Sequence, residues 1–170
     1  MTLRGRPPTD AEYQQWRVAS VETYAAEELA AGRVAADDAV ASATRSYAEL
    51  LPDGPDTKGS TLLRLVDGAL AHDPENGAPE GGAPSVGWLW VSHRAPRGPA
   101  GLAWVFDVEV DEHLRGRGYG RAAMLLAEQV ARDIGATELG LNVFGRNHAA
   151  RALYDSLGYT TTSLQMRKPL

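Results

Sequence analysis

Arg115-Gly116-Arg117-Gly118-Tyr119-Gly120 lies between a predicted strand, Leu102–Val110, and a predicted helix, about Tyr119–Ile134. Glycines at alternate positions let the backbone turn sharply and leave its N–H groups open. The positive N-terminal end of the helix points to the same place. A strand, a glycine loop and a helix in this order predict a site for a phosphate or pyrophosphate. On this loop alone, a glycine-rich turn that binds nothing is the alternative.

The spacing of the glycines argues against two common nucleotide-binding loops. A dinucleotide fingerprint needs G-x-G-x-x-G at the first strand–helix turn, whereas here Arg121 stands where the third glycine belongs. A Walker A loop needs Gly-Lys followed by Ser or Thr, and this loop has neither. A nicotinamide-dependent oxidoreductase is therefore the weakest of the functions considered.

The composition is that of one α+β domain spanning residues 1–170, with 44% hydrophobic and 23% charged residues. The net charge of −5 argues against a nucleic-acid partner. Because the chain has no cysteine, a disulfide framework, a thiol nucleophile and a thiolate metal site are excluded, and no metal is expected. We find no secretory signal and no apolar run of about 20 residues. A cytoplasmic protein without a membrane partner is expected.

The predicted elements follow the order β-α-α-β-β-β-α-β-α-β, with one βαβ crossover in the second half. The strands are predicted at Leu3–Arg6, Thr61–Asp67, Val86–Ser92, Leu102–Val110, Glu138–Val143 and Tyr159–Met166. The helices are predicted from the N-cap Thr9 to Ala31, with Glu12 completing a capping box, and at Ala36–Leu51, Tyr119–Ile134 and Asn147–Leu157. A loop is expected at Ala71–Pro84, which is rich in Gly and Pro.

A second motif follows the glycine loop. Residues 142–159 read N-V-F-G-R-N-H-A-A-R-A-L-Y-D-S-L-G-Y. With the R-x-x-G-x-G loop, this segment resembles the GNAT superfamily of acyl-CoA-dependent N-acetyltransferases. The resemblance is close over Val105–Met166 and rests on strand order alone over Thr61–Ala103. It implies a GNAT-like fold, with a mostly antiparallel sheet and a V-shaped splay between the fourth and fifth strands.

The resemblance implies that acetyl-CoA is the co-substrate. The loop amides of Gly116, Arg117, Gly118, Tyr119, Gly120 and Arg121 would hold its pyrophosphate, with Arg115, Arg117 and Arg121 as counter-charges. The backbone of Val108 and Val110 would pair with the pantetheine arm and polarise the thioester carbonyl. Asn142, Asn147 and Tyr154 complete the expected cofactor contacts. The alternatives stay open: a solvated basic patch for the arginines, core positions for the valines, and an N-cap for Asn147.

Tyr154 matches the family's general acid, whose phenol meets the departing thiolate, although a core tyrosine is the alternative. Ribosomal-protein acetyltransferases carry a glutamate where this chain has Asn142, so a base must come from elsewhere. Strand alternation puts Asp107 and Glu109 on one face with Val105, and Val108 and Val110 on the other with Trp104 and Phe106. Glu109 is the first candidate base, Asp107 the second and His93 a third. Exposed strand charges are the alternative for both acids.

The acceptor side is expected near the first two helices. Six aromatic residues would form one wall of the acceptor pocket, or alternatively would belong to the hydrophobic core: Tyr13, Trp16, Tyr24, Tyr47, Trp88 and Trp90. A wall with acids beside it suits a cationic amine, on a small molecule or a peptide. The expected activity is acetyl transfer to a primary amine by direct attack in a ternary complex, and the alternative is a non-catalytic acyl-CoA-binding domain. One strand follows the last helix, so a missing, merged or partner-supplied final strand, and hence a homodimer, is left open.

Overall fold

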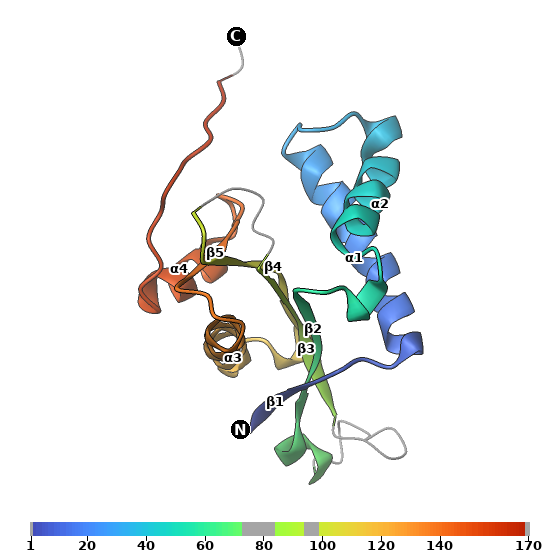
Figure 1. The fold of residues 1–170 in the computed structure, drawn as a ribbon. Coiled ribbons are helices and arrows are strands. Elements are labelled where there is room, and N and C mark those ends of the chain that lie inside the picture. The colour runs from blue at the N-terminus through green and yellow to red at the C-terminus, as the bar shows by residue number, and fades with distance from the viewer. Residues whose placement is uncertain (1, 73–83, 94–98, 169–170) are drawn as a thin grey trace.

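Five strands form one sheet in the order β1-β2-β3-β4-β5 (Figure 1). The computed structural model describes residues 2–72, 84–93 and 99–168. The strands are β1 (Leu3–Arg6), β2 (Ser60–Asp67), β3 (Ser85–Ser92), β4 (Leu102–Val110) and β5 (Glu138–Leu141). Neighbouring strands are antiparallel except β4 and β5, which are parallel. The parallel pair is joined by a helix, so the βαβ crossover and the mixed α+β sheet expected from the sequence are confirmed.

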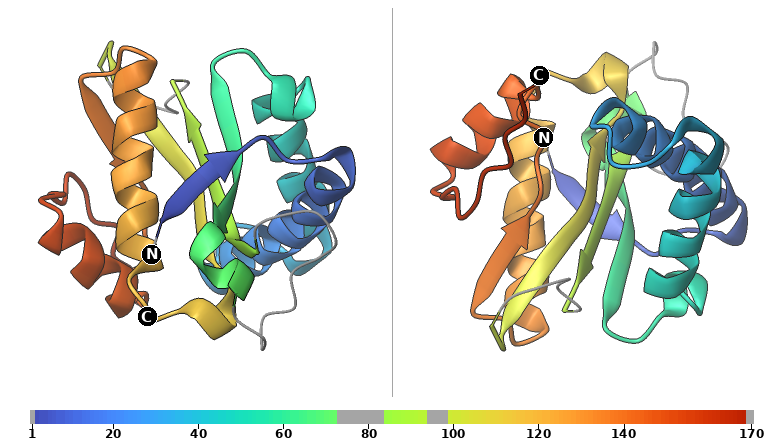
Figure 2. Two further views of the ribbon diagram at one scale, coloured as in Figure 1. Left: turned by 90° about the horizontal axis from the view of Figure 1, so that it is seen from below. Right: turned by 90° about the horizontal axis from the view of Figure 1, so that it is seen from above.

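The sheet is covered on both faces (Figures 1 and 2). The helices are α1 (Asp10–Ala30), α2 (Ala39–Leu50), α3 (Tyr119–Asp133) and α4 (His148–Ser156). The α1–α2 pair lies on one face, and α3 lies on the other with α4 beside it. Helix α1 begins at the predicted capping box: Thr9 accepts from the Glu12 amide, and the Glu12 carboxylate accepts from the Thr9 amide. Among the described residues, no helix is long and apolar enough to span a bilayer.

Each face of the sheet has its own core. On the α3 face, aliphatic side chains of the sheet pack against small residues of the helix, among them Leu65, Val86, Leu89, Ala123 and Ala127. On the α1–α2 face, the core is largely aromatic and includes Tyr13, Trp16, Tyr47, Trp88 and Trp90. The core on the α3 face is thus built from aliphatic and small side chains, and the core on the α1–α2 face is built largely from aromatic rings. The two cores hold the central strands β3 and β4 between them.

The strand predicted at Tyr159–Met166 is wrong. This segment leaves α4 without pairing to any described strand (Figure 1), and its side chains are largely exposed. The segment contains three consecutive threonines followed by a serine; threonine favours extended backbone, but these side chains supply no apolar face to bury. Leu164 and Met166 are exposed as well. The predicted loop at Ala71–Pro84 falls mostly on residues 73–83, which lie outside the described residues.

Candidate active site

A β-bulge in β4 shapes the site. Trp90 of β3 pairs with Asp107 and the next residue, Val91, pairs with Val105, so Phe106 is an extra residue without a partner on β3. A bulge reverses the alternation of side chains along a strand. Phe106 therefore stacks on Trp90 on the α1–α2 face, with ring centroids 4.6 Å apart. The alternation predicted for this strand is correct on each side of the bulge but not across it.

The bulge also marks the point where β4 and β5 separate. The two strands pair only from Leu102–Val105 to Glu138–Leu141, and β4 continues to Val110 without a described partner on that side. A hollow of about 170 Å³ lies in the opening. Its walls come from four elements: Glu27 of α1, Val105–Val108 of β4, the end of β5 with the following loop (Leu141–Phe144 and Asn147), and Tyr154 of α4. The V-shaped splay expected from the sequence is thus present.

Asp107 lies in this hollow and is held by the aromatic core. The indole N–H of Trp16 donates to Asp107 Oδ2 over 2.9 Å. Burial raises the pKa of Asp107 to about 6, the Trp16 hydrogen bond opposes the shift, and the nearby charges of Glu109 and Glu27 add to it. A carboxyl group with a pKa near 6 is largely ionised at neutral pH and still accepts a proton readily. Asp107 is therefore the better placed of the two predicted bases.

Tyr154 faces the same hollow from the other side. Burial, and to a lesser degree the charge of Asp107, raise the pKa of the Tyr154 phenol above its ordinary value of 10. The hydroxyl group therefore keeps its proton at neutral pH and is available as a donor. The structure thus brings together the predicted acid and one of the two predicted bases, Tyr154 and Asp107, which lie 47 residues apart in the sequence. Glu109, the first candidate base of the sequence analysis, is exposed and does not line the hollow.

The glycine loop presents open amides. Gly116 and Gly118 have positive φ angles of 76° and 90°, which only glycine adopts without strain. The first helical hydrogen bond of α3 runs from the Ala122 amide to the Gly118 carbonyl. In the part of the chain that the structure describes, the amides of residues 116–121 donate to no backbone carbonyl. Six such donors at a helix N-terminus fit a pyrophosphate group.

The arginines beside the loop differ in their contacts. Arg115 Nε donates to the Val110 carbonyl over 3.1 Å, so this side chain folds back onto the end of β4. Arg121 donates to the hydroxyl of Ser156 and so ties α3 to α4. Arg117 is exposed at the loop tip. Asn147 caps α4, because its Oδ1 accepts from the Ala150 amide at 3.1 Å, and it also lines the hollow. The N-cap alternative for Asn147 is therefore correct, and its contact with a cofactor stays a prediction.

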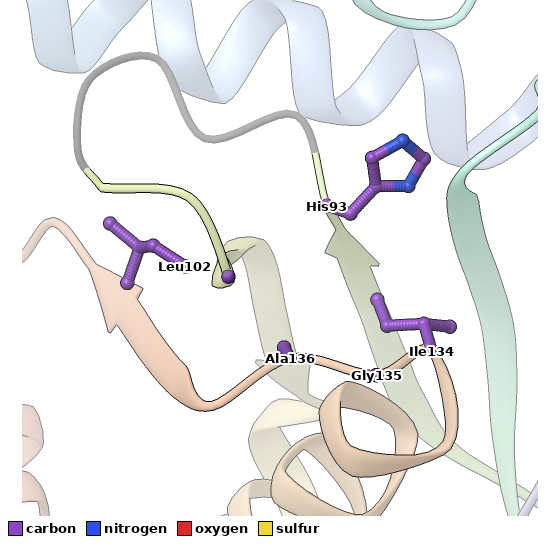
Figure 3. A pocket seen from close by; sticks show the side chains of 6 residues that line it. His93, Leu102, Ile134, Gly135 and Ala136 are labelled. Atoms are coloured by element: carbon purple, nitrogen blue, oxygen red, sulfur yellow. The ribbon is translucent and has the colours of Figure 1, made fainter.

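His93, the third candidate base, lies elsewhere. It follows the end of β3, three residues after Trp90, the strand partner of Asp107. Figure 3 shows it beside a second hollow of about 310 Å³, whose other lining residues belong to the start of β4 and the turn between α3 and β5. Neither Asp107 nor Tyr154 lines this second hollow. The structure therefore does not bring His93 to the candidate active site.

The aromatic wall predicted for the acceptor side is mainly core. Tyr13, Tyr47, Trp88 and Trp90 are buried around Trp16, whose ring centroid lies 5.6–6.0 Å from each of theirs. Such spacings are typical of packed aromatic pairs. The aromatic residues that line the hollow are instead Phe106, Phe144 and Tyr154. The core alternative is thus correct for these four residues, and only Trp16 reaches the site, through its N–H group.

Glu27 is a site residue that the sequence analysis missed. It lies near the end of α1, 80 residues before Asp107, and lines the hollow with it. Burial raises the pKa of Glu27, while the charges of Arg146 and Arg33 oppose the shift. The guanidinium groups of these two arginines each lie 5.0 Å from the ring of Phe144. No local sequence motif surrounds Glu27. Its place in the site follows only from the tertiary packing of α1 against the splay.

A five-stranded mixed sheet, splayed at a bulge beside a glycine loop, defines an acetyltransferase fold, and comparison with known proteins assigns the family. Residues 44–159 match the acetyltransferase (GNAT) family, which is more than half of the chain. The chain therefore belongs to the GNAT acetyltransferase family. The resemblance inferred from the two sequence motifs is confirmed.

Individual relatives agree with this assignment. The uncharacterized N-acetyltransferase YycN of Bacillus subtilis is 31% identical over the full length of both chains, and its crystal structure superposes with a TM-score of 0.81 over 99% of each. The uncharacterized N-acetyltransferase YdgE of the same organism is 26% identical over 95% of this chain and 94% of its own. A structure of AAC(6')-Iy in complex with a CoA-containing bisubstrate analog has the same fold, with a TM-score of 0.57 and 12% identity over the whole of both chains.

Proposed function

We propose that the protein transfers the acetyl group of acetyl-CoA to a primary amine by direct attack in a ternary complex. The observation that carries this proposal is the splay. It opens the edge of β4 from Phe106 to Val110, which has no described strand partner, toward a hollow lined by the half-buried carboxyl group of Asp107 and the protonated phenol of Tyr154. The glycine loop with its open amides follows β4 after one short 3-10 turn, Glu112–Leu114.

The free edge of β4 and the loop together suit a long, phosphorylated thioester. On the splayed side, where β4 has no described strand partner, the backbone of Val108 and Val110 would pair with the amide groups of a pantetheine arm, and the Val110 carbonyl would exchange its present contact with Arg115 Nε. Such pairing adds a strand-like segment to a sheet edge. The amides of Gly116–Arg121 would hold the pyrophosphate, and Arg117 at the loop tip would add a counter-charge. The likeness to AAC(6')-Iy, which was solved with a CoA-containing analog, supports this choice of co-substrate.

The chemistry needs one proton acceptor and one proton donor. The ammonium group of the acceptor first loses one proton to solvent. The neutral amine nitrogen then attacks the thioester carbonyl, a second proton passes from nitrogen to Asp107 as the C–S bond breaks, and the thiolate of coenzyme A takes a proton from Tyr154. The raised pKa values of Asp107 and Tyr154 suit these opposite roles. Glu27 and Asp107 place negative charge in the hollow, which favours a cationic acceptor. Positioning of the two substrates supplies the remainder of the rate enhancement.

Asn142 favours a second candidate function. It lines the hollow at the position where the ribosomal-protein acetyltransferases that the chain resembles carry a glutamate, and an amide cannot accept a proton. A domain that binds acyl-CoA without transferring the acyl group would explain this residue. The presence of Asp107 in the same hollow, 35 residues earlier in the chain, supports catalysis instead.

One experiment separates the two functions. The purified protein is titrated with acetyl-CoA by calorimetry and then mixed with a pooled amine library while free thiol is measured. Saturable binding together with acceptor-dependent thiol release supports the transferase. Binding without release from any amine, in a protein shown to be folded, supports the non-catalytic domain. Absence of acetyl-CoA binding refutes both.

A further inference from the structure

Asp67, outside the hollow, is a buried carboxylate with three donors from three segments. Its Oδ1 accepts from the amides of Thr2 and Ala69 at 3.0 and 2.9 Å, and its Oδ2 accepts from the hydroxyl of Tyr119 at 3.0 Å. Burial alone would raise the pKa of Asp67, but the three hydrogen bonds outweigh it and leave the pKa below its ordinary value of 3.8. The group is therefore a charged acceptor at neutral pH.

Tyr119 connects this carboxylate to the glycine loop. It is the first residue of α3, its side chain is 5% exposed, and it stands between Gly118 and Gly120. The start of α3 lies next to β1 and the end of β2 (Figure 2). Since both neighbours are glycines, Tyr119 carries the side chain that attaches this end of the loop to the body of the protein.

The other end of the loop is fixed as well. The Asp111 amide donates to the Val86 carbonyl over 2.8 Å, and Leu114 is fully buried in the core under α3. Residues 115–118 lie between these two attachments and are exposed. The conformation of this exposed arc, and so the direction of its amides, depends on what holds Leu114 and Tyr119.

We propose that Asp67 is a positioning residue for the cofactor loop, which it holds through the hydroxyl of Tyr119 with the amides directed toward a pyrophosphate. The inference rests on the proposed function, because it assumes that acetyl-CoA binds at this loop. Asp67 itself does not touch the co-substrate. Its effect is confined to the pyrophosphate end of the ligand, so a ligand without a pyrophosphate is insensitive to it.

The test compares acetyl-CoA with S-acetylpantetheine, which lacks the pyrophosphate and the adenosine. Kd values are measured for the wild type, Tyr119→Phe and Asp67→Asn, by calorimetry for acetyl-CoA and by competition against it for S-acetylpantetheine. We expect Tyr119→Phe to raise the Kd for acetyl-CoA about tenfold and to leave that for S-acetylpantetheine within about twofold, as for loss of one hydrogen bond to a charged group. Asp67→Asn keeps an acceptor oxygen, so it is expected to raise the Kd for acetyl-CoA by less than Tyr119→Phe does. If Tyr119→Phe does not fold, the Kd values of Asp67→Asn decide the question.

Ser60→Ala is the matched control. It removes another side-chain hydrogen bond of β2, the 3.1 Å contact with Ser92 at the opposite end of the strand, and is expected to change neither Kd. Equal affinity of wild type and Tyr119→Phe for acetyl-CoA would overturn the inference. An equal rise in the Kd values for acetyl-CoA and S-acetylpantetheine would overturn it too, because it indicates a general loss of structure. If the wild type binds no acetyl-CoA, the proposed function itself fails.

Discussion

The replacement Asp107→Asn tests whether the candidate base is a buried acid. In the folded protein the pKa of Asp107 is raised from 3.8 to about 6. At 1.36 kcal/mol for each pH unit, this difference corresponds to about 3 kcal/mol of differential stability. The sign follows from linkage. The folded state binds the proton more tightly, so the contribution of Asp107 is most favourable below pH 4 and is lost as the pH rises through 6.

Asparagine keeps an oxygen that accepts from the Trp16 indole N–H but cannot ionise. The variant is therefore expected to gain stability relative to the wild type as the pH rises. The expected gain is about 2 kcal/mol between pH 4 and pH 8. The measurement is the free energy of unfolding in urea at several pH values for both proteins. In the same variant kcat/KM is expected to fall about 100-fold, because the base is missing.

Glu109→Gln is the control for this experiment. It removes an exposed carboxylate two residues along the same strand, whose charge adds to the raised pKa of Asp107, and is therefore expected to reduce the pH dependence of stability only in part, whereas Asp107→Asn removes the contribution of Asp107 altogether. A stability difference between Asp107→Asn and wild type that does not vary with pH would refute the assignment of a buried, high-pKa acid. Unchanged kcat/KM in Asp107→Asn would refute its role as the base, whatever the stability shows.

Three further predictions concern the same site. Tyr154→Phe removes the proton donor and should lower kcat about 100-fold while the Kd for acetyl-CoA stays within twofold; equal turnover would contradict the acid role. The kcat/KM of the wild type should rise with pH around an apparent pKa of about 6, and Trp16→Phe, which deletes the hydrogen bond that lowers the pKa of Asp107, should move this rise to higher pH. Gly118→Ala forces a residue with a β-carbon to φ 90° and should weaken acetyl-CoA binding roughly tenfold, whereas Gly68→Ala, at an open position without positive φ, should not.

The sequence predicts most elements because their signals are local. The capping box of Thr9 and Glu12 marks the start of α1, and the alternation in Leu102–Val110 identifies β4 with both of its bounds. The family assignment also comes from local motifs, namely the glycine loop and the segment around Tyr154. The segment Tyr159–Met166 fails, because its threonines favour extended backbone but a strand also needs a partner and an apolar face to bury.

The candidate site is less predictable, since it depends on contacts between distant segments. No glycine or proline lies at the bulge, so the sequence does not predict it. The bulge nevertheless places Phe106 and Asp107 together on the α1–α2 face. Because the sequence does not predict the bulge, Asp107 and Glu109 appear equivalent as candidate bases. In the structure Asp107 lines the hollow and Glu109 is exposed. Glu27 reaches the hollow only because α1 packs over the splay.

Trp16 belongs both to the aromatic core and, through one N–H group, to the site. Replacement of a neighbouring ring such as Tyr47 or Trp90 would shift the indole and with it the acidity of Asp107. The interior of the α1–α2 layer thus determines both the packing of the core and the acidity of a site residue. Changes in acceptor preference during evolution are easier to reach through Glu27 and the loop carrying Phe144, which line the hollow without belonging to the buried aromatic core. Divergence among relatives in substrate choice should therefore concentrate in these segments, while the aromatic interior drifts slowly.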